Sequence, residues 1–110
     1  MIESRSVADD IAVATEVVSE VTGVLIPDIR GPSRLGEIAW ARHVACYAAR
    51  VSTRATLKAI GEYMNGRDHS TVVNAIRRVS ADREIYPDLD DIISFIEAET
   101  RRRLWHERTQ

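Results

Sequence analysis

The chain has 110 residues, of which 45% are hydrophobic and 29% charged, with 5 glycines and 3 prolines. That length favours a single domain, and that composition excludes a fibrous or intrinsically disordered chain. The formal net charge of −2 excludes a uniformly basic protein that binds nucleic acid over its whole surface.

Charge is unevenly distributed along the chain. Residues 30–83 contain ten lysines and arginines against four acidic residues, whereas residues 1–29 and 84–110 are each net negative. A basic middle region is therefore predicted between acidic ends. The single cysteine, Cys46, excludes a disulfide framework, and we find neither a signal peptide nor a membrane span. A cytoplasmic protein without membrane contact is expected.

Residues 7–22 repeat apolar side chains at spacings of three and four, which predicts an amphipathic helix. We expect Ser6 and Asp9 to form a capping box at its start and Gly23 to end it. The following stretch, VLIPDIRGPS at 24–33, contains helix-breaking proline and glycine and leaves at most a short helical turn.

A second long helix is expected over 34–51, with Ser33 as its N-cap. Its many alanines on one face predict close packing, so this helix should be the central and most buried one. Thr56 is expected to cap a short helix over 57–64, and Asn-Gly at 65–66 then turns the chain.

A helix over 68–83 follows, capped by Asp68, and Pro87 separates it from a last helix over 88–104. No segment alternates apolar and polar residues with period two. The predicted fold is therefore an all-α helical bundle, in which the acidic helices 7–22 and 88–104 flank the basic region.

Residues 56–83 have the outline of a helix-turn-helix unit, whose second helix can lie in the major groove of DNA. On a helical wheel, Val72, Ile76 and Val79 form a core stripe, and His69 falls nearer to the core side than to the exposed face. The opposite face carries no carboxylate and consists of Arg67, Ser70, Thr71, Asn74, Arg77, Arg78 and Ala81. Such a face favours DNA binding, with an ordinary solvated helix as the alternative.

Three segments resemble parts of one known protein family: GRDHSTVVNAIRRV at 66–79, ARHVACYAAR at 41–50 and TLKAIGEYMNG at 56–66. The first is similar to the signature of the C-terminal DNA-binding domain of the bacterial replication initiator DnaA. The second is similar to the central helix of that domain, and the third to its first helix-turn-helix element. The resemblance covers roughly residues 20–97 in matching order. It implies a TrpR-like helix-turn-helix fold and double-stranded DNA as the partner.

The resemblance also implies a role for individual residues. Arg34 would enter the minor groove from a basic loop. The start of the recognition helix would read base edges, and other basic residues would contact phosphates. The base-reading set is Asp68, His69, Ser70 and Thr71, the phosphate set is Arg42, Arg67 and Arg78, and His43, Thr56 and Asn74 complete the candidate DNA-binding residues.

Catalysis, nucleotide binding and metal binding have little support. Asp68, His69 and Ser70 are chain neighbours and cannot form a nucleophile–base–orienter line. The segment GEYMNGRD at 61–68 has glycines at Walker A spacing but lacks the Lys-Ser/Thr ending. His43 and Cys46 are too few ligands for a metal. We therefore expect no enzyme and no cofactor.

The expected function is sequence-specific binding of a free-standing domain to DnaA-box-like duplex sites. Regulation of replication initiation or of transcription on the nucleoid would follow. The alternative is a protein-interaction module that keeps the fold and binds a protein partner, or a second copy, through its acidic terminal helices.

Overall fold

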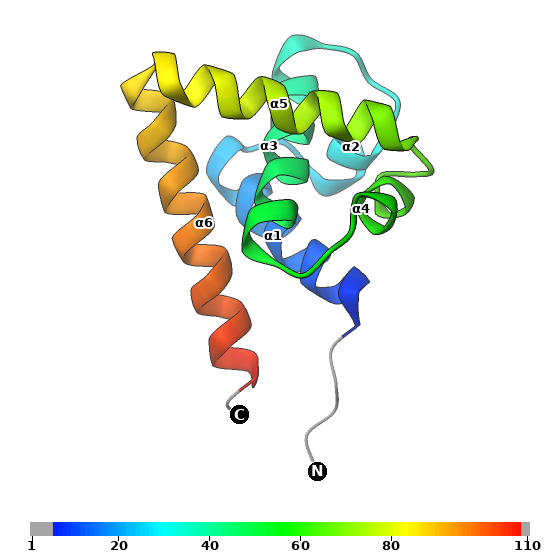
Figure 1. The fold of residues 1–110 in the computed structure, drawn as a ribbon, viewed down its shortest axis with the longest axis vertical. Coiled ribbons are helices and arrows are strands. Elements are labelled where there is room, and N and C mark those ends of the chain that lie inside the picture. Colours follow the sequence, from blue (N-terminus) through cyan, green and yellow to red (C-terminus); the bar gives the residue numbers. More distant parts are fainter. Residues whose placement is uncertain (1–5, 109–110) are drawn as a thin grey trace.

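In this computed structural model, the described residues are 6–108, and within them the chain forms six α-helices and no strand (Figure 1). The predicted all-α fold is thereby confirmed. The helices are α1 (Val7–Thr22), α2 (Ile26–Arg30), α3 (Gly36–Ser52), α4 (Leu57–Tyr63), α5 (His69–Ile85) and α6 (Pro87–Arg108). The predicted domain also includes residues 1–5 and 109–110, which lie outside the described range.

Helix α3 lies at the centre of the bundle and contacts each of the other five described helices. Its small side chains Ala41, Ala45, Ala48 and Ala49 are completely buried, so neighbouring helices can approach its backbone closely. Around it, α5 crosses the top of the molecule in Figure 1 and α6 runs down the left side. The prediction of a central, most buried helix is confirmed.

The helix ends form where local hydrogen bonding predicts them. Ser6 Oγ accepts a bond from the Asp9 amide at 3.1 Å, and the Asp9 carboxylate accepts one from the Ser6 amide at 3.2 Å. Gly23 ends α1 with φ 77°. Thr56 and Asp68 cap α4 and α5 through the amides of residues three positions later. These contacts satisfy amides that have no partner inside the helix.

Two predicted boundaries were wrong. Helix α3 begins at Gly36, with Leu35 as an N-cap that makes no side-chain capping bond. Ser33 instead accepts a bond from the Leu35 amide at 3.2 Å within an extended loop, so Ser33 is not the cap. Helix α6 starts at Pro87 and continues to Arg108, past the predicted end at residue 104. Proline is favoured in the first turn, where its missing amide costs nothing.

No helix in the described range is both long enough and apolar enough to cross a membrane. Cys46 is 2% exposed, and burial raises the pKa of its thiol to about 11. Its thiol therefore stays protonated at neutral pH and behaves as a small core side chain.

Candidate nucleic-acid interface

Helices α4 and α5 are joined by a tight turn that depends on two left-handed residues. Asn65 and Gly66 have φ values of 61° and 78°. The amides of Gly66 and Arg67 then both donate to the Gly61 carbonyl at 3.0 Å. A Cβ on Gly61 would lie 2.2 Å from the Arg67 carbonyl oxygen, so only glycine fits there. The turn thus fixes where α5 starts relative to α4.

The first turn of α5 presents an exposed polar edge. Asp68 Oδ1 accepts bonds from the Thr71 amide at 2.9 Å and from Ser70 Oγ at 3.0 Å. These bonds, the Thr71 amide foremost, lower the pKa of Asp68, so its carboxylate is ionised at neutral pH. His69 is exposed, which corrects its placement nearer to the core on the helical wheel. At a helix end, fewer neighbours cover a side chain than the wheel assumes.

A groove of about 760 Å³ separates this edge from the loop between α2 and α3. It brings together five predicted site residues from four separate parts of the chain. These residues are Arg34, Arg42, His43, Arg67 and Thr71. Thr56 lies at the start of α4, and Asn74 and Arg78 lie further along the exposed surface of α5, so none of these three lines the groove.

Arg42 holds the loop in place. Its side chain is buried, and its Nε donates to the Ile29 carbonyl at 2.7 Å. Nη1 donates to the backbone carbonyl of Ser33 at 2.9 Å. Nη2 donates to the backbone carbonyls of Asp28 at 3.1 Å and Gly31 at 2.8 Å. Its guanidinium is thus occupied by backbone carbonyls, which compete with the phosphate contact predicted for Arg42. Burial, with Arg67 next in importance, lowers its pKa.

Arg67 performs a similar task from the helix-turn-helix side. Its Nη1 donates to the carbonyls of Met64 at 2.7 Å and Arg30 at 3.2 Å, and its Nη2 donates to Gly31. The predicted phosphate contact therefore competes with three backbone bonds. Arg67 ties the turn before α5 to the loop that carries Arg34, so the two walls of the groove keep a fixed separation.

Two residues missing from the predicted set reinforce this connection. Asn65 Nδ2 donates to the Arg30 carbonyl at 2.6 Å. Arg30 Nε donates to the Tyr63 carbonyl at 2.7 Å, and its guanidinium lies 4.1 Å from the Tyr63 ring centroid. The Asn-Gly pair signalled a turn, but the sequence contains no signal for bonds between residues 35 positions apart.

The groove is lined by four arginines, Arg30, Arg34, Arg42 and Arg67, and by no acidic side chain of the described residues. His43 is half-buried, and burial lowers its pKa, with further lowering by Arg78, Arg42 and Arg67. Asp82 opposes the shift but ranks behind all three arginines. Arg34 and Arg78 are exposed. The neighbouring positive charges disfavour protonation of His43, and a nearby anion would favour it. The same excess of positive charge suits the phosphate backbone of DNA.

Known proteins resemble this chain in sequence and in fold. A family model described as the bacterial dnaA protein helix-turn-helix matches residues 11–79. The chain is 45% identical over 64 residues to the chromosomal replication initiator protein DnaA of Mycoplasma capricolum, covering 58% of this chain and 14% of that protein. It is 33% identical over 82 residues to DnaA of Herminiimonas arsenicoxydans, covering 74% and 18% respectively.

A solved structure, described as a DNA replication initiation factor, superposes with a TM-score of 0.80 at 26% identity. The match covers 88% of this chain and 30% of that one. This chain matches less than a fifth of the length of each of the two DnaA proteins named above. Since the family model covers more than half of the chain, this protein belongs to the bacterial DnaA helix-turn-helix family.

Proposed function

We propose that this domain binds duplex DNA sequence-specifically at sites resembling DnaA boxes. Helix α5 would lie in the major groove and Arg34 in the adjacent minor groove. The observation that carries the proposal is the groove between Arg34 and Thr71, because the Arg42 and Arg67 bonds fix its two walls. A rigid pair of contact elements loses little conformational freedom on binding.

The residues at the start of α5 have the chemistry for base reading. The ionised carboxylate of Asp68 can accept from cytosine N4, and His69 and Thr71 can contact thymine or accept and donate at base edges. All three are exposed. Arg34 is also exposed and suits a narrow A·T-rich minor groove, where the negative potential is strongest.

Fluorescence anisotropy with a labelled duplex tests the proposal. One duplex carries a DnaA-type box and the other a shuffled sequence of equal length, each at two salt concentrations. We expect binding to the box to be roughly tenfold tighter or more, because specific and nonspecific affinities differ at least that much. Equal, strongly salt-dependent binding would leave only a nonspecific basic surface, and no binding would contradict the proposal.

Base contacts and phosphate contacts should respond differently to alanine substitution. His69→Ala and Thr71→Ala are expected to cost about 1–3 kcal/mol on the box and little on the shuffled duplex. Arg78→Ala should weaken both duplexes alike and reduce the salt slope by about one. Anisotropy titrations of the three variants separate these outcomes. A uniform loss for His69→Ala and Thr71→Ala would overturn their assignment as base readers.

The biological role that follows is occupancy of initiator sites. A domain that fills a DnaA-type box on the nucleoid would compete with the initiator or regulate transcription there. Footprinting of an origin fragment with both proteins present tests this, since competition predicts mutually exclusive protection of the same boxes.

A further inference from the structure

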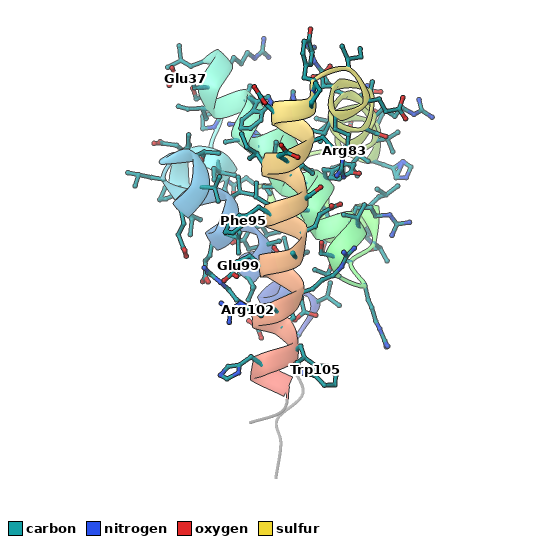
Figure 2. The ribbon with its side chains drawn as sticks, turned by 90° about the vertical axis from the view of Figure 1, so that its left-hand side faces the viewer. Glu37, Arg83, Phe95, Glu99, Arg102 and Trp105 are labelled. Atoms are coloured by element: carbon teal, nitrogen blue, oxygen red, sulfur yellow. The ribbon has the colours of Figure 1, made fainter. Side chains whose placement is uncertain are left out.

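Helix α6 has two faces of different character. Ile93, Ile96, Thr100 and Leu104 are buried against the bundle. Along the opposite face runs a line of six exposed side chains, which we call the α6 seam: Asp88, Asp91, Phe95, Ala98, Arg102 and Trp105. Phe95 is 57% exposed and Trp105 70%. Figure 2 shows α6 at the front of the molecule, with Phe95, Arg102 and Trp105 labelled along it.

The spacing of the seam is that of a coiled coil. Its six positions alternate steps of three and four residues, so they lie on one line along the helix as the a and d positions of two and a half heptads do. Large aromatic side chains left in water on such a line are typical of a helix that pairs with another helix. Helix α6 also lies beyond residue 79, where the family match ends.

Charge along the seam selects the partner and its direction. The N-terminal part of the seam is acidic, with Asp88 and Asp91, and the C-terminal part carries Arg102. A second copy aligned in parallel would face like charges at each of these positions. Aligned antiparallel, Asp91 of each copy meets Arg102 of the other, so two opposite-charge pairs form.

The apolar positions fit the same antiparallel register. When Asp91 faces Arg102, Phe95 of each copy faces Ala98 of the other, and a large ring fills the space above a small side chain. Trp105 then lies across from Asp88, at each end of the contact. At the four inner positions, 91, 95, 98 and 102, a single register therefore satisfies both size and charge complementarity.

Arg102 retains the donors that this pairing needs. Its Nε and Nη2 donate to the Glu99 carboxylate at 2.9 and 2.6 Å. Its Nη1 makes no hydrogen bond within the described residues, and the side chain is 66% exposed. The Glu99 contact orients the guanidinium and leaves its Nη1 donors available to a partner.

We propose that two copies of this chain associate through antiparallel α6 helices, about a two-fold axis between residues 95 and 98. The seam lies along α6, on the opposite side of the molecule from α4 and the start of α5 (Figure 1). Such a dimer leaves both candidate DNA interfaces open and holds two of them in one particle. Simultaneous binding of two sites rests on the proposed function, whereas association itself does not.

Sedimentation velocity of the free protein over a concentration series tests the association. The mass should rise from 12.4 kDa for the monomer toward twice that value. Phe95→Asp should raise the dissociation constant by roughly tenfold or more, because a central aromatic contact is lost and a charge is buried. Leu25→Asp is the matched control, since Leu25 is 66% exposed but lies outside the seam. Circular dichroism checks that both variants fold.

Charge exchange gives the sharper test of register. Asp91→Arg and Arg102→Asp should each weaken association, and the double variant should restore it because the pair is reversed. A protein that stays monomeric at every concentration overturns the proposal, as does a dimer sensitive to Leu25→Asp alone or a double variant without recovery. Single-box binding is measured in parallel, so failure of DNA binding and failure of association are read separately.

Discussion

Replacing Arg42 with methionine is expected to lower the free energy of unfolding by about 3 kcal/mol. Methionine keeps much of the buried chain but removes every donor, leaving the carbonyls of Asp28, Ile29, Gly31 and Ser33 without that partner. Because these bonds set the path of the loop that carries Arg34, DNA affinity should fall as well. Chemical denaturation monitored by circular dichroism measures the stability change.

Arg34→Met is the matched control, because it makes the same substitution at an exposed arginine in the loop that Arg42 holds in place. It should leave the free energy of unfolding nearly unchanged while weakening binding to a DnaA-type box. If Arg42→Met were as stable as the unmodified protein but bound all duplexes more weakly, Arg42 would act as a phosphate contact, as the sequence predicted, and its structural role would be wrong.

Replacing Gly61 with alanine is expected to cost about 2–3 kcal/mol of stability. The new Cβ would overlap the Arg67 carbonyl oxygen at 2.2 Å, and that atom belongs to the backbone and cannot rotate away. The turn between α4 and α5 would have to open, which strains the two bonds that the Gly61 carbonyl accepts. Thermal and urea unfolding of the variant measure the loss.

Gly36→Ala serves as the comparison for this effect. A Cβ at Gly36 meets nothing within 4 Å, and the residue lies in the first turn of α3. Alanine there should be neutral or slightly stabilising because it favours the helix. Equal destabilisation by both substitutions would show that the crowding at Gly61 is not what limits the turn.

The sequence alone predicted the elements whose physics is local. Ser6, Thr56 and Asp68 cap helices through amides three residues away, and Gly23 and the Asn-Gly pair at 65–66 adopt positive φ. Such signals involve neighbours in the chain, so composition and spacing reveal them. The helix-turn-helix outline followed from them, the absence of period-two alternation predicted the all-α fold, and the GRDHSTVVNAIRRV segment indicated the family.

Only the tertiary structure decided which arginines are available to a partner. Arg34, Arg42 and Arg67 are chemically identical and lie in the same basic region, yet Arg34 is exposed whereas the other two bind backbone carbonyls. The carbonyls bonded to Arg42 are 9 to 14 residues away, and those that tie Arg67 to the loop are 36 and 37 residues away.

The same distinction applies to the two acidic terminal helices. The alternative function would use both as a surface for a partner. Helix α1 packs against α2, α3, α4 and α6, while α6 leaves the seam in solvent. Hydrophobic periodicity identifies the face that a helix buries, but it does not say whether other helices cover the remaining surface of that helix. That depends on which helices meet in space, because burial and hydrogen bonding are set by contacts between residues far apart in the chain.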